Sequence, residues 1–264
     1  MKHGFARTST WTSDPVYEED GFSVCHFHLS SSEATKALWN HDFALTYTVR
    51  VNASSLSTQL RISNTGSNSF DCQCLLHTYY SSPSILTTSV AGLQNHKGVE
   101  SVTTGTRREF IEPHARILFN SETDAKYSDV TAPIEIEMAD RKIRLEIESI
   151  LDEKQKKADC VVWNAWIEKC RAIGDMEDED YKRYVCVEPG CVNGMTTVEA
   201  KKELVLKQTI VVVEEMWIVC WILGGNGGGK MTDYRSRLNY LYAVWNSESW
   251  KGGSSFFKWI LPEA

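Results

Sequence analysis

The sequence predicts an all-β fold, a large antiparallel β-sandwich. Short segments in which apolar and polar residues alternate recur along the chain, and connectors rich in Ser, Asn and Gly separate them. Helical periodicity is confined to two short stretches, 30–38 and 168–181. Many short strands at this spacing, with few helices between them, are typical of a sandwich.

The predicted strands follow from alternation with a period of two residues. In segment 44–51, Leu45, Tyr47 and Val49 fall on one face, as expected of a strand with one buried side. A turn-like break at 139–141 separates two other alternating segments. The remaining predicted strands are 57–63, 134–138, 143–147 and 204–213.

The chain has 264 residues, which is long enough for one large domain or two small ones. Its character changes at residue 216, because five of the nine tryptophans lie beyond that point and 224–229 is nearly all glycine. We therefore predict a β-sandwich domain over 1–215 and a separate tail of unknown structure over 216–264.

The composition excludes several classes of function. A formal net charge of −7 argues against nucleic-acid binding, which needs a basic face. No segment reaches the roughly 18 apolar residues of a membrane-spanning helix. The first residues lack a secretory signal pattern, so the eight cysteines are interpreted as reduced thiols. These features predict a cytoplasmic protein, and we expect it to be a monomer.

Two residues carry the chemistry of an acid–base site. His77 lies in the run Phe70–Tyr80 and opens a loop, while Glu188 lies in the sequence Val-Glu-Pro-Gly. Pro189 favours an extended backbone at Glu188, and Gly190 permits a sharp turn, which would project the carboxylate from a strand end. A carboxylate with a histidine is the minimal general acid–base pair. Taken singly, a Glu before Pro-Gly is more often a surface turn, and a lone His is more often a satisfied or solvated side chain.

Several uncommon motifs follow one another from His3 to about Val213. They are His3-Gly-Phe-Ala-Arg7, Trp39 with Phe43, Asn64 with Phe70, His77-Thr-Tyr79, Ala91-Gly-Leu93, Glu122-Thr-Asp124, Val161-Val-Trp-Asn-Ala-Trp166, and Cys186-Val-Glu-Pro-Gly190. In this order and spacing the chain resembles the glucose-6-phosphate 1-epimerase branch of the aldose 1-epimerase (galactose mutarotase) superfamily.

The resemblance implies a galactose mutarotase-like supersandwich that interconverts the α and β anomers of a hexose 6-phosphate without metal or cofactor. It makes Glu188 the base that takes the proton of the C1 hydroxyl and His77 the acid that protonates the ring oxygen. Asp124 would accept hydrogen bonds from sugar hydroxyls, and His3 would orient a hydroxyl. Arg7 would bind the phosphate, for which a bidentate guanidinium is suited. We assign the aromatic residues Phe43, Phe70, Trp163 and Trp166 to the core.

The chain also departs from the family pattern. Relatives carry several strands before the His-Gly-Phe-Ala-Arg segment, including a Gly-Gly-Ile-Pro-type motif and a further phosphate-contacting arginine. Lys2 stands where relatives have Gln, and Ala165 stands where they have Pro. We therefore expect a sandwich that lacks N-terminal strands. A truncated, inactive product is one alternative, and a non-catalytic sugar-phosphate binder that keeps Asp124 and Arg7 is another.

Two further motifs are weaker. Gly224–Lys230 has the glycines of a phosphate-binding loop, but Met231 stands where the Walker pattern needs Ser or Thr. Asp175–Asp180 is acidic but lacks the glycine and the distal glutamate of a calcium loop, so we interpret it as a solvated loop.

Overall fold

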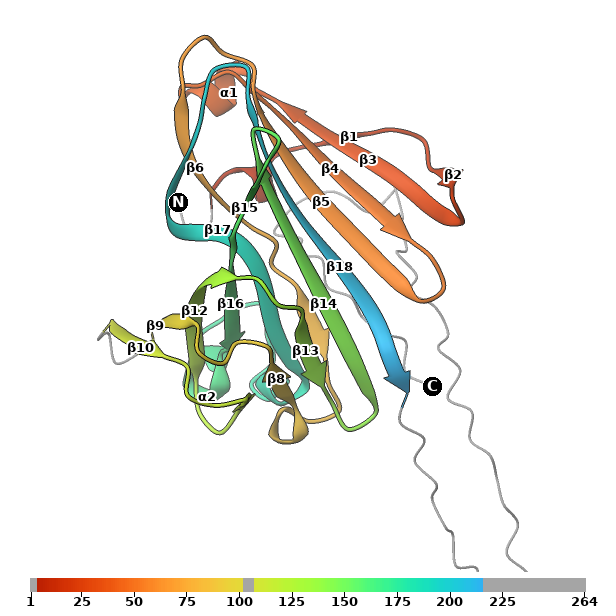
Figure 1. The fold of residues 1–264 in the computed structure, drawn as a ribbon, viewed down its shortest axis with the longest axis vertical. Helices are drawn as coiled ribbons and strands as arrows, with labels where there is room; N and C mark the ends of the chain where they lie inside the picture. Colours follow the sequence, from red (N-terminus) through yellow and green to blue (C-terminus); the bar gives the residue numbers. More distant parts are fainter. Residues whose placement is uncertain (1–3, 102–106, 216–264) are drawn as a thin grey trace, which may run out of the picture.

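The computed structural model describes residues 4–101 and 107–215, which form two antiparallel sheets (Figure 1). The predicted all-β fold is confirmed. The order of the larger sheet is β1-β3-β4-β5-β18-β14-β13-β8-β11, with β2 on β3 and β15 on β14. The order of the smaller sheet is β10-β9-β12-β16-β17-β6, with β7 also on β17. The predicted tail over 216–264 and His3 lie outside the described residues.

The strands of the larger sheet are β1 (Thr12–Ser13), β2 (Tyr17–Glu19), β3 (Phe22–Ser30), β4 (Phe43–Val51), β5 (Ser55–Asn64), β8 (Ser89–Ala91), β11 (Arg116–Leu118), β13 (Ile134–Glu137), β14 (Arg141–Leu151), β15 (Lys154–Lys156) and β18 (Glu203–Glu215). Those of the smaller sheet are β6 (Phe70–Leu75), β7 (Tyr79–Ser81), β9 (Lys97–Glu100), β10 (Arg108–Ile111), β12 (Thr123–Val130), β16 (Ala158–Asn164) and β17 (Tyr184–Val198). The helices are α1 (Glu33–Lys36) and α2 (Trp166–Arg171), with 3₁₀ turns η1 (Ala6–Thr8), η2 (Ile85–Thr87) and η3 (Asp180–Arg183).

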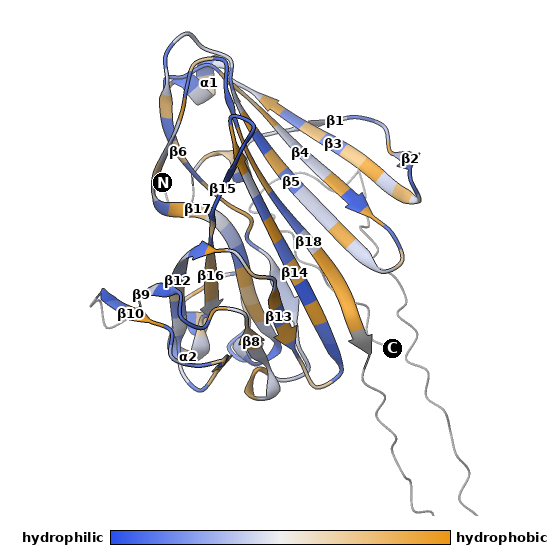
Figure 2. Ribbon diagram, in the orientation of Figure 1, coloured by the Kyte–Doolittle hydropathy of each residue, from blue (hydrophilic) through white to orange (hydrophobic). Residues whose placement is uncertain are grey.

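The five segments predicted from alternation are strands. They correspond to β4, β5, β13, β14 and β18, each with ends within a few residues of the prediction. The break at 139–141 is the turn between β13 and β14, which pair as an antiparallel hairpin. Alternating colours along β14 show this period directly (Figure 2). The two stretches with helical periodicity contain α1 in one case and α2 with η3 in the other.

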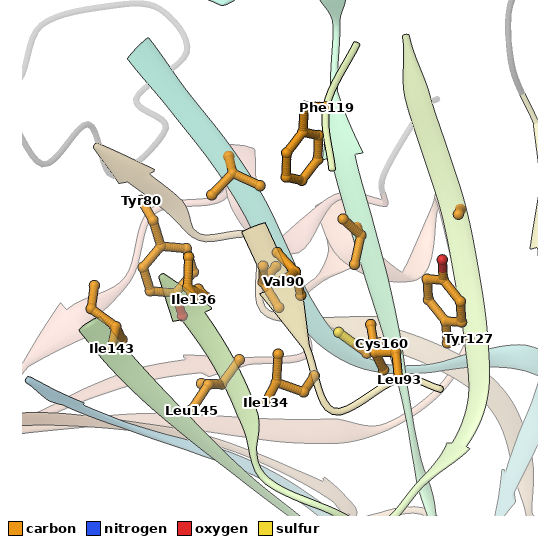
Figure 3. Close-up of a cluster of buried hydrophobic side chains, with 14 of the residues drawn as sticks. Tyr80, Val90, Leu93, Phe119, Tyr127, Ile134, Ile136, Ile143, Leu145 and Cys160 are labelled. Carbon is orange, nitrogen blue, oxygen red and sulfur yellow. The ribbon is translucent and has the colours of Figure 1, made fainter. Parts of the chain in front are cut away.

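The lower part of the core lies between the two sheets (Figure 3). Val90, Ile136 and Leu145 of the larger sheet pack in the same fully buried cluster as Tyr127 and Val185 of the smaller sheet. Burying side chains of this size stabilises the fold by about 1.5–3 kcal/mol each. This cluster fixes one face of β12, β16 and β17, so the alternate residues of these strands must point away from the core.

A second cluster forms the upper part of the core, near the first residues of the chain. It joins Phe43 and Leu206 of the larger sheet to Phe70 and Cys74 of the smaller sheet. Phe5 packs on the same cluster and contacts the Phe43 ring, with ring centroids 5.6 Å apart. The N-terminal segment is thereby held against this cluster, beside the start of β4.

The larger sheet extends beyond this packing. Its strands β3, β4 and β5 fan away from the smaller sheet (Figure 1). Val49 and Val51 share a face with the buried Leu45, yet they are only half-buried and pack on neither cluster of the described residues. Within the same residues, no helix is long and apolar enough to cross a membrane. Cellular location and oligomeric state stay predictions.

Candidate active site

His77 and Glu188 occupy opposed positions on neighbouring strands. Strands β6 and β7 both pair with β17, and the register that places Leu75 opposite Gly190 also places Tyr79 opposite Cys186. His77 lies midway between Leu75 and Tyr79, so it falls opposite Glu188. The two residues, 111 positions apart in sequence, therefore face each other because of strand pairing.

Pro189 explains why the chain opens at His77. The Leu76 amide donates a hydrogen bond to the Pro189 carbonyl at 2.8 Å, which carries the ladder one residue past the end of β6. Proline has no N–H, so it cannot donate to the Leu76 carbonyl in return. The ladder stops there and resumes at Tyr79 in β7. The interruption leaves His77 outside regular pairing, directly beside the carboxylate of Glu188.

The two side chains are in contact but differ in exposure. The His77 Nδ1 lies 3.4 Å from the Glu188 Oε1, which is the distance of an ion pair and longer than a good hydrogen bond. The side chain of Glu188 is 4% exposed and that of His77 is 26% exposed. The histidine can therefore exchange protons with solvent or substrate, while the carboxylate is shielded from water.

Aromatic rings enclose the pair. The His77 ring stacks on Tyr79, with centroids 4.9 Å apart, and meets the edge of Trp163 at 6.0 Å. The rings of Trp163 and Tyr184 stack at 5.6 Å. We assigned Trp163 to the core from sequence, and it packs against a small buried cluster that contains Cys170 and Tyr181. It is half-buried and lies on the same face of the sheet as Glu188. Such ring faces are suited to contact the C–H groups of a sugar.

The environment of Glu188 favours its neutral form. Burial raises the pKa of this carboxyl well above its ordinary value, and the nearby charge of Asp124 raises it further. A buried carboxylate with a raised pKa binds a proton more readily than one in water. Glu188 is therefore suited to take a proton from a weakly acidic hydroxyl group.

Asp124 lies on the same face of the sheet, two strands away from Glu188. Its partner across β12 and β16 is Trp163, which in turn pairs with Cys186 on β17. The Lys169 Nζ of α2 lies 3.1 Å from the Asp124 Oδ2 and 3.0 Å from the Glu122 Oε1. Burial raises the pKa of Asp124, and Lys169 opposes this by stabilising the carboxylate.

Lys169 was not predicted from the sequence. Burial lowers the pKa of Lys169, but the hydrogen bonds and charges of Glu122 and Asp124 outweigh this effect, so the pKa is raised overall. The lysine is 45 positions from Asp124 and belongs to no motif, so only the folded structure brings the two together. It fixes one oxygen of Asp124 and thereby orients this carboxylate.

Asn164 fixes α2 relative to the strands that carry the site. Its side-chain amide donates to the carbonyls of Tyr181 and Tyr184 at 2.8 and 2.9 Å, and its oxygen accepts the Trp166 amide at 2.9 Å. Asn164 is fully buried, so each of these bonds is shielded from water. The conformation at Ala165, with φ −64°, is one that a proline could also adopt.

The predicted turn at Glu188–Gly190 is wrong. Glu188, Pro189 and Gly190 are buried and lie inside the long strand β17. Pairing with β16 on one side and with β6 on the other keeps this part of the chain extended. Gly190 is required for space: a Cβ there would lie 2.7 Å from the Leu75 Cδ1 and 2.9 Å from the Cys74 carbonyl oxygen. The glycine thus permits close approach of β6.

Arg7 lies near the N-terminus of the described residues. It is an exposed residue of η1, whose neighbours Phe5 and Ala6 pack on the upper cluster. That cluster also contains Leu76, the residue before His77. The segment that carries Arg7 is therefore anchored on the same group of side chains as the strand that leads to His77.

Comparison with known proteins places these residues in a family context. A family model described as "Aldose 1-epimerase" matches residues 1–210. A relative from Cenchrus ciliaris, provisionally named glucose-6-phosphate 1-epimerase, is 29% identical over 210 residues, and one of the same provisional name from Escherichia coli is 28% identical over 218. The alignments cover 76% and 80% of this chain. The chain spans 62% of the length of the first relative and 68% of the second.

Comparison with solved structures gives the same result as the sequence comparison. A Salmonella typhimurium protein provisionally named as a mutarotase, YeaD, matches with a TM-score of 0.69 and 27% identity, covering 81% of this chain and 68% of that one. Slr1438 from Synechocystis matches with a TM-score of 0.61 at 19% identity, covering 80% and 68%, which bears on the fold alone. The resemblance found from the motifs is confirmed.

We predict that Gly190→Ala lowers both stability and activity. The added methyl group must push β6 away from β17, which costs about 1–3 kcal/mol and widens the gap between His77 and Glu188. Thermal unfolding should show a decrease in Tm of roughly 2–4 °C for each kcal/mol. Gly174→Ala is the matched control, because a Cβ at Gly174 meets nothing within 4 Å. Equal Tm values for the two variants would contradict the close-approach argument.

Glu188→Gln is expected to raise stability at neutral pH. The folded-state pKa of Glu188 lies above its unfolded value, so the folded state gives up its proton less readily. The wild type therefore has its full stability below the unfolded pKa of Glu188 and loses part of it as pH rises through the folded pKa of this group. The glutamine of the variant is neutral at every pH, so the variant has no such loss. The Tm difference between variant and wild type should therefore grow as pH rises above the unfolded pKa of glutamate, about 4.3.

Glu112→Gln provides the control for this measurement. Glu112 is also buried, but its carboxylate accepts hydrogen bonds from Tyr127 Oη at 2.8 Å and from the His114 amide at 3.0 Å. An amide cannot replace both acceptor oxygens, so this variant should lose stability. A Glu188→Gln variant that lost stability in the same way would show that the carboxylate of Glu188 is satisfied in the fold.

Proposed function

Because the chain belongs to the aldose 1-epimerase family, we propose that it interconverts the α and β anomers of a hexose 6-phosphate, with His77 and Glu188 as acid and base. The observation that carries this proposal is the contact between a half-exposed imidazole and a buried carboxylate, 3.4 Å apart and enclosed by aromatic rings. Glucose 6-phosphate is the favoured substrate, since two relatives carry that sugar phosphate in their names.

The reaction needs one proton removed and one added. The Glu188 carboxylate takes the proton of the C1 hydroxyl while protonated His77 gives a proton to the ring oxygen, so the bond from C1 to the ring oxygen breaks and an aldehyde forms. Rotation about the C1–C2 bond presents the other face of the carbonyl. The C5 oxygen then attacks C1 while His77 removes the proton of the C5 hydroxyl, and Glu188 returns its proton to the carbonyl oxygen. Both groups end as they began.

The raised pKa of Glu188 supports its role as the base. Burial raises the pKa of Glu188, so the step that transfers a proton to its carboxylate is less uphill than it would be for a carboxylate in water. The exposed edge of His77 supports the role of the acid, because a substrate can reach the imidazole there.

Asp124 is proposed to hold the sugar by its hydroxyl groups. Lys169 contacts Oδ2 of this carboxylate, and the carboxylate retains acceptor capacity for sugar hydroxyls. The half-buried ring of Trp163, opposite Asp124 on the neighbouring strand, offers an apolar surface beside it. His3 keeps its proposed role of orienting a hydroxyl.

Arg7 is proposed to bind the phosphate group. Its guanidinium suits a phosphate dianion, and η1 is exposed to solvent while its neighbours are anchored beside Leu76. A sugar whose C1 lies between His77 and Glu188 would carry its phosphate at the other end of the molecule.

We expect the protein to accelerate anomerisation of freshly dissolved α-glucose 6-phosphate, measured by polarimetry or by proton NMR of the C1 hydrogen. Glu188→Gln should reduce the rate by about 10²–10⁴-fold, the usual contribution of a general acid or base. Glu168→Gln serves as the control, because Glu168 is an exposed residue of α2. An unchanged rate in Glu188→Gln would reject its role as base. Binding without acceleration would favour the non-catalytic sugar-phosphate binder.

Arg7→Ala should separate phosphate binding from catalysis. Loss of a charge-assisted contact worth about 1.5–3 kcal/mol predicts a rise in KM for glucose 6-phosphate of roughly 10–100-fold, with little change in kcat. Rates with unphosphorylated glucose should not change. Arg171→Ala, which removes an exposed arginine of α2, is the control. Equal effects of Arg7→Ala on both sugars would contradict the assignment.

A further inference from the structure

Cys186 places a third ligand-bearing side chain beside the acid–base pair. It lies two residues before Glu188 on β17, on the same face of the strand, and opposite Tyr79. One ligand atom each from His77, Cys186 and Glu188 can be chosen so that all three lie within 4.8 Å of one another. Over residues 4–101 and 107–215, this is the one group of three such side chains that lies close enough to share a metal ion.

We propose that His77, Cys186 and Glu188 bind a zinc ion, which occupies the acid–base pair and blocks it. Nitrogen, thiolate sulfur and carboxylate oxygen are the three ligand types that zinc takes in proteins. Cys186 has no part in the proposed anomerisation, so the sulfur is what distinguishes the trio from a plain acid–base pair.

The distances suit tetrahedral coordination. Zinc bonds of about 2.0–2.1 Å to nitrogen and oxygen put those two atoms roughly 3.3 Å apart at a tetrahedral angle. The His77 Nδ1 and the Glu188 Oε1 already lie 3.4 Å apart, too far for a good hydrogen bond and close to this edge length. With a zinc–sulfur bond of about 2.3 Å, an inward movement of the thiol would complete the trio, whose ligand atoms lie within 4.8 Å of one another.

The charges near the site favour a cation. Asp124 places negative charge on this face of the smaller sheet, and Glu188 would give up its proton when it binds zinc. Lys169 is engaged by Asp124 and Glu122, and within the described residues the ionic partner of Glu188 within 4 Å is His77. Burial raises the pKa of the Cys186 thiol, so zinc binding would release a proton from it.

The half-exposed imidazole of His77 borders the route by which the ion would enter, and its Nδ1 is itself buried. The His77 side chain is 26% exposed, whereas Glu188 is 4% exposed and Cys186 is fully buried. The fourth coordination position would face the solvent side of the imidazole and hold water. Resting on the proposed function, this predicts that zinc inhibits anomerisation, because Nδ1 of His77 and the carboxylate of Glu188 can no longer exchange protons.

Cobalt(II) tests the site directly, since it replaces zinc and gives absorption bands that report thiolate ligation and tetrahedral geometry. We expect the wild-type chain to bind one cobalt ion with a thiolate charge-transfer band, and zinc to remove this band. Cys186→Ala should lose the charge-transfer band. Cys25→Ala should keep it, because Cys25 is a partly exposed thiol on β3 in the other sheet.

His77→Ala provides a second test. Because the imidazole is half-exposed, this variant should fold even where Cys186→Ala does not. It should lose the tetrahedral visible bands. The proposal is overturned if wild type gives no charge-transfer band, or if the bands survive in either variant. These readouts do not depend on turnover, so they stand even if anomerisation is not observed. Where it is observed, inhibition by zinc that a chelator reverses supports the proposal, and an unchanged rate at saturating zinc overturns it.

Discussion

The missing N–H group of Pro189 is the constraint on which the site depends. A proline inside a central strand removes one donor from the ladder, and here the strand it faces responds by opening for three residues between β6 and β7. The register is kept across the gap, because Leu75 and Tyr79 both remain paired with β17. The opening thus releases His77 from the sheet without moving it away from Glu188.

Alternate residues of strand β17 point into the core and toward the site. Val185 and Val187 are fully buried in the cluster between the sheets, while Tyr184, Cys186 and Glu188 point to the opposite face. Packing of the valines therefore holds the carboxylate in place, although burial of that carboxylate itself disfavours its charged form. The fold thus holds at a fixed position a carboxyl group whose charged form is disfavoured by burial, and such groups are common in catalytic sites.

The sequence predicted those features that depend on local pattern. Alternation found β4, β5, β13, β14 and β18, because apolar and polar residues alternate over part of each of these strands. The motifs identified His77 and Glu188, and strand pairing brings these two together. Local pattern failed at Gly190, where Pro-Gly favours a turn but hydrogen bonding to two neighbouring strands keeps the chain extended. Lys169 and Cys186 were missed because their roles arise from contacts that no short motif records.

The central claim is that His77 and Glu188 act as one unit, and a double-mutant cycle on kcat/KM for anomerisation tests it most directly. The rates of His77→Gln, Glu188→Gln and the double variant would be compared with that of the wild type. If the pair works together, each single variant already loses the shared contribution, so the double variant should be scarcely slower than either one. Losses that multiply in the double variant would contradict the account, because they would mean that the two residues contribute independently.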